Sequence, residues 1–386
     1  MSNFNYIYDS EPKKILFPDS KNENWRYLNL RSLKEKIDNV ESVKVSHTIS
    51  EGKSLNTHLM IDDKRIHLNK RLPDGICIEI IDAKNIKSLD DKIKNKFGKI
   101  AKLDDYFISE NTDKFNQLII VNISKESSMK EILNIDINVS GDVELKPRFL
   151  FYSERMTQCS IQVNFNNNNA ITNTVFEFYL DDKSNIELVS IADSKSSVEI
   201  SNYWFELNKK SNLKATFISL GDDGIAKNDI RVNLVGEKAN ADIGGLYIPC
   251  SKSILDCNIK MNHLCKKTFS NQFFRGILKE YSRASFTGLV KIEKNCKGSK
   301  SNQINNNLVL SKKAHIKSDP QLEIYCNDVE CSHGSTVGQF DDDSLFYLCS
   351  RGISKENSKK MLLEAFYMDV LNRINGSQIE SIVERI

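Results

Sequence analysis

The chain has 386 residues, of which 54 are basic and 52 are acidic, so its formal net charge is +2. This balance gives no electrostatic argument for binding nucleic acid or an anionic membrane. The length exceeds the usual size of one hydrophobic core, which predicts one elongated domain or two to three compact ones. Aliphatic, aromatic and thiol residues make up 40% of the chain, enough for a sizeable core.

The lack of a recognisable targeting signal and the cysteine usage predict a cytoplasmic protein. The sequence contains no run of about 18 apolar residues, so no membrane-spanning helix is expected. The start, MSNFNYIYDSEPKK, lacks the apolar segment of a secretion signal. Nine cysteines without a regular framework indicate a reducing compartment. The absence of a CxxC pair in the sequence weighs against a zinc ribbon or a thioredoxin-type redox site.

Residues 1–150 are predicted to form a mixed N-terminal region. Asn24-Trp25-Arg26-Tyr27 precedes LRSLKEKIDN, which has a short helical pattern. The rest alternates poorly and includes charge-rich segments such as DDKIKNKFGK. Trp25 and, further on, Trp204 are expected to be packing residues.

From about residue 150, short runs rich in β-branched and aromatic residues recur between polar turns. They are NTVFEFYL, NIELVSIA, SVEISNYWFEL, NLKATFISL, DIRVNLVG, ASFTGLVKI and HIKSDPQLEIY. This composition and periodicity are typical of strands and not of helices. We therefore expect an all-β core over residues 151–352.

The turns between these runs share a pattern of a polar or basic residue, a small residue, a polar residue and an apolar one. Lys183-Ser184-Asn185-Ile186 and Lys210-Ser211-Asn212-Leu213 are the clearest examples, and the spacing of the motif is irregular. The pattern suggests an internal repeat. Hairpin dipeptides are almost absent from this part of the sequence, Asp223-Gly224 being one candidate. These features favour a parallel β-helix over a β-sandwich.

Residues 353–386 are predicted to form two C-terminal helices. Ser354 can cap the first, whose apolar residues Leu362, Phe366 and Val370 lie four apart. Asn375-Gly376 would end it. The sequence Ser377-x-x-Glu380 is a capping box that begins a second, short helix. The apolar face of this second helix could close onto the first helix or bind another protein, and the sequence leaves both open.

The segment ECSHGSTVG, residues 330–338, carries the candidate functional pair. If it is a strand, Cys331 and His333 lie on one face. Together they supply two ligands, whereas tetrahedral zinc or an iron–sulfur cluster needs about four. No nearby residues complete a set at a familiar spacing, so a metal site would be labile or finished by another chain. A catalytic dyad is disfavoured, since same-face neighbours lie about 6.5 Å apart. A packed thiol and a hydrogen-bonded histidine form the structural alternative.

The remaining candidate residues and segments are expected to have structural roles. His263, next to Cys265 in KMNHLCKK, is expected to be packed or solvent-facing. The segment GDDG at 221–224 lacks GxxxxGK[ST], so it is not a phosphate loop. Three consecutive acids at 341–343 indicate a solvated helix start better than a cation site. Arg351-Gly352 is expected to end the solenoid and lead into the helix.

Several ordered segments then carry a resemblance to a known family. They are ENWRY at 23–27, FFRGI at 273–277, SRASFTG at 282–288, NNLVLS at 306–311, PQLEI at 320–324, ECSHGSTVGQ at 330–339 and LFYLCSRGI at 345–353. Together these segments resemble the SufB/SufD family of iron–sulfur cluster assembly proteins. They are closest to SufD, because SufB has E-H-E-A where this chain has C-S-H-G. The candidate ligand cysteine of SufB also has no counterpart at Ile304. Cys326 departs from the family pattern, and its role is left open.

The resemblance implies a right-handed parallel β-helix with an N-terminal mixed or helical region and C-terminal helices. It implies a heterodimer with a SufB-like paralogue, with a possible homodimer in isolation, and docking of the SufC ATPase on the C-terminal helices. A nascent iron–sulfur cluster would be held transiently at the SufB–SufD interface and would not be tightly bound. His333 of the C-S-H-G motif, with Cys331 beside it, would provide this chain's metal ligand, and SufB would supply a cysteine and a glutamate.

The expected function is thus a non-catalytic scaffold, with ATP hydrolysis assigned to SufC. A SufB-like scaffold paralogue and an adaptor that only recruits the ATPase are the alternatives. A polysaccharide-active β-helix enzyme is a remote one, because such enzymes use clustered carboxylates or calcium and are usually secreted. No nucleic-acid or membrane partner is expected.

Overall fold

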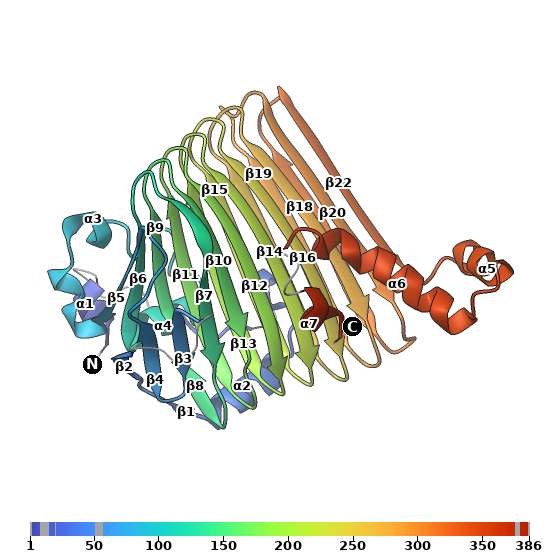
Figure 1. Cartoon of the computed structure of the whole chain (residues 1–386), viewed down its shortest axis with the longest axis horizontal. Helices are drawn as coiled ribbons and strands as arrows, with labels where there is room; N and C mark the ends of the chain where they lie inside the picture. The colour runs from blue at the N-terminus through green and yellow to red at the C-terminus, as the bar shows by residue number, and fades with distance from the viewer. Residues whose placement is uncertain (1, 8–14, 20, 51–56, 375–378, 385–386) are drawn as a thin grey trace.

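Consecutive strands of the core alternate between two sheets, in which they pair in parallel with the strand two positions along the chain (Figure 1). The computed structural model describes residues 2–7, 15–19, 21–50, 57–374 and 379–384. Within these residues, each strand pair such as β11 (Ile171–Leu180) and β12 (Asn185–Lys195) forms one coil of a solenoid. The predicted parallel β-helix is therefore confirmed.

The described residues place eleven strands in each sheet. The first sheet contains β1 (Glu41–Ser42), β5 (Ile76–Asp82), β6 (Gln117–Ile123), β8 (Val143–Leu145), β9 (Arg148–Ser153), β11, β13 (Val198–Leu207), β15 (Ile225–Leu234), β17 (Ile254–His263), β19 (Arg283–Ile292) and β21 (His315–Ile324). The second contains β2 (Ser46–Ser50), β3 (Leu59–Asp62), β4 (Arg65–Asn69), β7 (Ser128–Asn138), β10 (Gln158–Phe165), β12, β14 (Asn212–Asp222), β16 (Asn240–Cys250), β18 (Phe269–Leu278), β20 (Ser299–Val309) and β22 (Val329–Gly338). Parallel pairing thus already includes β6 and β7, and the division of the chain at residues 150 and 352 stays a prediction.

The turn motif marks the corners of the coils. Lys183, Ser196, Lys210 and Lys238 have φ values of 60°, 50°, 58° and 62°. Each is followed by a buried small residue, such as Ser184 after Lys183. The left-handed residue turns the chain sharply, and the small side chain fits inside the corner. Because the motif occurs at both ends of the strands, its spacing in the sequence is irregular although the coils are nearly uniform.

Coils near the C-terminal end of the solenoid are longer than those in its middle. Side-chain ladders join residues 27 positions apart at Asn185 and Asn212, 29 at Asp242 and Asn271, and 31 at Asn271 and Asn302. The neighbouring strands remain in register, so side chains of one kind stack above each other. This stacking determines which residues meet at the end of the solenoid.

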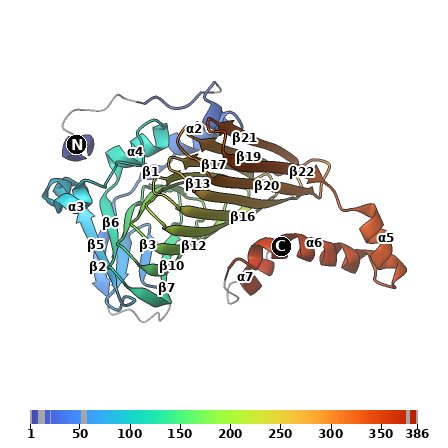
Figure 2. The same ribbon diagram turned by 90° about the horizontal axis from the view of Figure 1, so that it is seen from above.

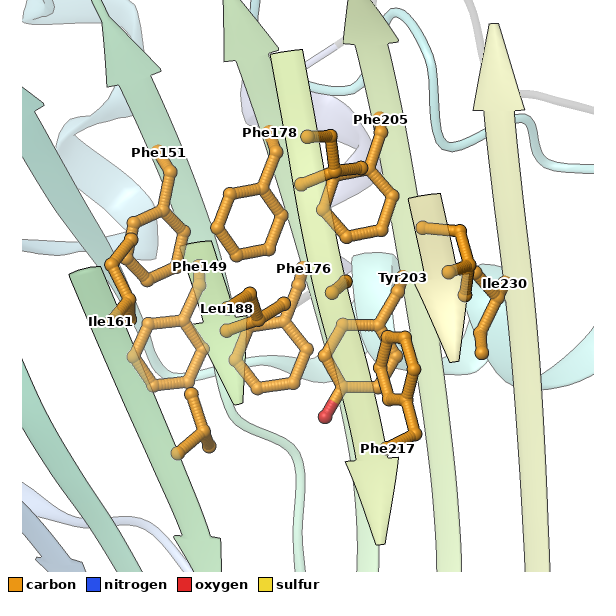
Figure 3. Packing of buried hydrophobic residues seen from close by; sticks show 14 of the residues in the cluster. Phe149, Phe151, Ile161, Phe176, Phe178, Leu188, Tyr203, Phe205, Phe217 and Ile230 are labelled. Carbon is orange, nitrogen blue, oxygen red and sulfur yellow. The ribbon is translucent and has the colours of Figure 1, made fainter. Parts of the chain in front are cut away.

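In the first coils the interior is aromatic (Figure 3). Two rows run across successive strands of the first sheet: Phe149, Phe176 and Tyr203, and Phe151, Phe178 and Phe205. Ring centroids within each row lie 4.2–4.8 Å apart in stacked geometry. Stacked rings add attraction beyond the area that they bury.

The N-terminal elements pack on the outer face of the first sheet. They are α1 (Phe4–Ile7), the 3₁₀ helix η1 (Glu23–Trp25), α2 (Leu30–Asp38), the 3₁₀ helix η2 (Ala83–Ser88), α3 (Asp91–Lys94) and α4 (Tyr106–Lys114). Trp25 is 1% exposed and lies with Leu33 and Phe107 against Val198 and Ile200. Trp204 is also buried, so both tryptophans pack as expected.

The C-terminal helices are α5 (Asp342–Ser350), α6 (Lys355–Leu371) and α7 (Ile379–Val383). Figure 2 shows α6 and α7 on the side of the second sheet and α2 and α4 on the side of the first. The buried face of α6 packs on the outer surface of β14, β16 and β18. The ion pairs of Arg275 with Asp369 and of Arg373 with Asp242 flank this contact. Ser354 caps α6, as predicted.

The short last helix closes onto the protein. Ile382 in α7 is 2% exposed and belongs to the same apolar cluster as Tyr367 and Val370 of α6. The first of the two alternatives for this helix is therefore the one observed. The expected helix end at Asn375-Gly376 and the Ser377 end of the capping box lie outside the described residues. Among the helices described, none is both long and apolar enough to cross a membrane.

Candidate functional site

The two sheets end in strands that have a partner on one side only. β22 pairs in parallel with β20, and β21 pairs with β19. Within the described part of the chain, no further strand pairs with the outer edge of β21 or of β22. The last coil is therefore uncapped, and its interior opens outward. Cys331 and His333 both lie on β22, so the condition on which their placement on one face depended is met.

Neighbouring hydrogen bonds show which way the side chains of β22 point. Ser335 donates across the coil to Ser318 of β21 at 2.7 Å. Ser332 and Thr336 instead donate to Asn302 and Asn306 of β20, at 2.8 and 2.9 Å. Alternation along a strand places residues 331, 333 and 335 on one face, the inner one. Cys331 and His333 therefore occupy the interior face of the open coil.

Accessibility differs between the two candidate ligands. His333 is exposed, whereas Cys331 is half-buried and packs against the core. Burial raises the pKa of the Cys331 thiol above its ordinary value. The thiol is therefore protonated at neutral pH and becomes a strong ligand or nucleophile only when a cation displaces the proton.

In the described part of the chain, Cys331 and His333 complete neither a metal site nor a catalytic site. Among the residues described, no group of three or more His, Cys, Asp and Glu side chains is placed to hold a metal ion. A further chain would have to add ligands before the pair could hold iron or zinc. The part that Cys331 and His333 play stays a prediction.

A polar floor underlies the open coil, in contrast to the aromatic interior of the first coils. Gln303 donates from Nε2 to Oε1 of Gln272 at 2.8 Å, and both side chains are fully buried. Asn305 accepts from Ser318 at 2.7 Å and donates to Tyr247 at 3.0 Å. Sequence analysis did not single out these residues. Their signal was the run Ser301, Gln303, Asn305 and Asn307, which places polar side chains at the inward positions of a strand.

His263 and Cys326 are structural residues. His263 is fully buried, and its Nδ1 and Nε2 lie 2.7 and 2.8 Å from the hydroxyls of Thr268 and Ser270. Burial lowers the pKa of His263 to about 4, so it is neutral and packed. Cys326 is also buried in the core cluster, in the turn between β21 and β22.

The acidic and glycine-containing segments serve as turns and caps. Asp341 accepts from the backbone N–H of Ser344 at 2.8 Å and begins α5, as predicted. In the segment at 221–224, Asp222 accepts from the Ser251 hydroxyl at 2.7 Å. The prediction for Arg351 was wrong in one respect. The solenoid already ends with β22, so Arg351 instead ends α5 and stacks over the ring of Tyr347, 5.2 Å from its centroid.

An apolar surface that sequence analysis missed lies on α5. Phe346 and Tyr347 are 75% and 58% exposed. In Figures 1 and 2 this helix stands away from the sheets, beyond the end of α6. The resemblance predicts docking of the ATPase on the C-terminal helices. Among these, Ile382 of α7 is buried, whereas Phe346 and Tyr347 of α5 are exposed, so α5 offers the freer apolar face. The signal was an aromatic pair just after the cap at Asp341.

The fold defines a parallel β-helix protein whose last coil carries a cysteine and a histidine at an open sheet edge. Comparison with known proteins identifies its family. Residues 137–366, more than half of the chain, match the model of the SUF system FeS cluster assembly SufBD core domain. The chain therefore belongs to the SufBD family of iron–sulfur cluster assembly proteins.

Relatives in bacteria agree with this family. An iron–sulfur cluster assembly SufBD family protein of Synechocystis is 25% identical over 93% of this chain and 84% of its own length. The iron–sulfur cluster assembly protein SufD of Escherichia coli is 31% identical over 40% of this chain and 37% of its own. SufD of Bacillus subtilis is 24% identical over 64% and 59%, respectively.

Proposed function

We propose that this chain is a SufD-like scaffold subunit that assists the assembly of nascent iron–sulfur clusters where it meets a SufB-like paralogue. The observation that carries the proposal is the open last coil, in which His333 is exposed on the interior face beside Cys331. The free edges of β21 and β22 can accept two further strands in parallel. A β-helix partner would continue the solenoid and bring its own ligands to this coil.

A shared and incomplete ligand set suits a scaffold, because the cluster is its cargo and has to be released. A closed cage of four thiolates would hold iron and sulfide too firmly for transfer. The cluster would therefore be transient, and the partner's ligands would complete it. Family membership supports a role in cluster assembly. The geometry of β22 supports the open last coil as the place where the cluster would form.

We further propose that the SufC ATPase docks on the C-terminal helices, chiefly on α5, and that ATP hydrolysis belongs to that partner. The exposed aromatic pair Phe346 and Tyr347 supports this choice, since aromatic residues are frequent energetic anchors of protein interfaces. An adaptor that only recruits the ATPase would need α5 and not His333. The two functions therefore separate experimentally.

The test is reconstitution of the complex with SufB-like and SufC-like partners, comparing His333→Ala with His315→Ala. His315 is a matched control, because it is also an exposed histidine on the last coil but lies on β21. We expect His333→Ala to lower bound iron and sulfide at least fivefold while the subunits still assemble. His315→Ala should retain the cluster. Normal cluster formation with His333→Ala would refute the scaffold site and favour the adaptor.

A further inference from the structure

A ladder of side-chain amides runs along the axis of the last coils and ends at His333. Gln272 on β18 pairs in register with Gln303 on β20, and Gln303 pairs with His333 on β22. The Nε2 of Gln303 donates to Oε1 of Gln272, so this group is directed back along the solenoid. The three positions are stacked at the spacing of neighbouring strands, about 4.8 Å.

The other end of the Gln303 amide has no partner. Its Oε1 is buried and accepts no hydrogen bond from the part of the chain that the structure describes. Buried carbonyl groups nearly always have a donor. Because Nε2 is committed toward β18, Oε1 is left for the side of β22. The next position of the ladder on that side is His333.

The amide of Gln303 can take this orientation because Gly288 on β19 has no side chain. A Cβ at Gly288 would lie 1.7 Å from Nε2 of Gln303 and 2.9 Å from Oε1 of Gln272. The glycine therefore leaves the space that the two amides fill.

The neighbouring layers offer no such acceptor. Asn305 already accepts from Ser318, and Ser335 donates to Ser318 in turn. On the other side, Ser301 below Cys331 is bonded to Ser270. Among the inward groups described next to His333, the Oε1 of Gln303 is a buried oxygen without a donor.

We propose that Gln303 is the positioning residue of the His333 imidazole. Its Oε1 accepts the N–H of one ring nitrogen, which fixes the tautomer and turns the other nitrogen, with its lone pair, out of the open coil. Histidines that bind metals commonly donate their second ring N–H in this way. The inference rests on the proposed function only where it makes His333 a ligand of iron. The hydrogen bond between His333 and Gln303 needs no partner protein and no metal.

The contact is tested on the full, unmodified chain by ¹⁵N–¹H correlation of the histidine rings at a pH where they are neutral. His333 is assigned by the loss of its signals in His333→Gln, and His263 reports that the fold is intact. We expect His333 to show one dominant tautomer. Gln303→Leu should return it to the mixture of free imidazole. Asn302→Ala, which alters an outward residue of the same strand, should not change it.

A His333 tautomer ratio that is the same in Gln303→Leu and in the parent protein would overturn the proposal. The reconstituted complex gives a second, separate readout. There Gln303→Leu should weaken iron retention about tenfold, the lower end of such outer contacts. A shifted tautomer with undiminished iron retention would confirm that Gln303 orients the ring and refute any effect of that orientation on iron binding, whereas His333→Ala tests the ligand itself, so the two failures are distinguishable.

Discussion

The segment ENWRY is held on the first sheet by a buried ion pair whose removal should be measurable. The Nζ of Lys227 lies 2.6 Å from Oδ2 of Asp256, and both side chains are 2% exposed. The same ammonium donates to the carbonyl of Asn24 at 2.8 Å and lies 4.6 Å from the ring centroid of Trp25. Asp256 also accepts from the hydroxyl of Ser285. The pair therefore joins the N-terminal segment to β15 and β17.

The expected perturbation follows from removing one partner. Lys227→Met leaves the carboxylate of Asp256 buried without a cation, which typically costs about 3–5 kcal/mol. Lys227→Met combined with Asp256→Asn removes both charges and keeps an acceptor for Ser285. We expect the double variant to lie within about 2 kcal/mol of the parent, because a neutral pair avoids the desolvation of an unpaired ion.

The assay is urea unfolding of the chain, followed by tryptophan fluorescence, since Trp25 is one of two tryptophans. The control is Lys214→Met, which breaks an exposed pair with Glu187 and should cost at most about 1 kcal/mol. A loss below about 1 kcal/mol for Lys227→Met would refute the reasoning. So would a double variant whose loss equals or exceeds that of the single one.

Two further predictions concern pH and docking. Burial raises the pKa of Glu199 to about 7, so the folded chain holds a proton that the unfolded carboxyl loses near its ordinary value of 4.5. Stability should fall as pH rises from about 4.5 to 7, and Glu199→Gln should be more stable than the parent at pH 8 by up to about 3 kcal/mol in urea unfolding. Equal pH profiles for the two proteins would contradict this. Phe346→Asp with Tyr347→Asp should weaken binding of the SufC-like ATPase more than tenfold by titration calorimetry, whereas Tyr281→Asp, in an exposed turn, should leave it unchanged. Undiminished ATPase binding by the α5 variant would exclude that helix as the docking surface.

The β-helix was predictable from local chemistry. Turns such as Lys183-Ser184 and Lys210-Ser211 mark many of the corners with a left-handed residue followed by a small one. The runs between them have strand composition. For the segment around Cys331 and His333 the sequence supplied only the consequence of a strand, namely that both residues share one face, and the structure supplies the strand.

The surroundings of the site could not be read in the same way. Gln303 lies in register between Gln272 and His333 only because coils of about 30 residues keep the strands aligned, and Gly288 comes from the opposite sheet. A change of one residue in any turn would shift every contact by one position. Likewise, whether α5 or α7 keeps its apolar face free depends on where α6 packs on the second sheet.

The amino-acid sequence by itself therefore indicated the β-helix, the thiol and imidazole at residues 331 and 333, and the C-terminal helices, because turn conformation and strand alternation act over a few neighbouring residues. The tertiary structure alone decided that His333 is exposed on the interior face of an uncapped coil, in register with the buried Gln303, and that α5 and not α7 keeps an exposed apolar face. Those outcomes depend on register and packing between segments some 30 to 150 residues apart, which local propensities do not encode.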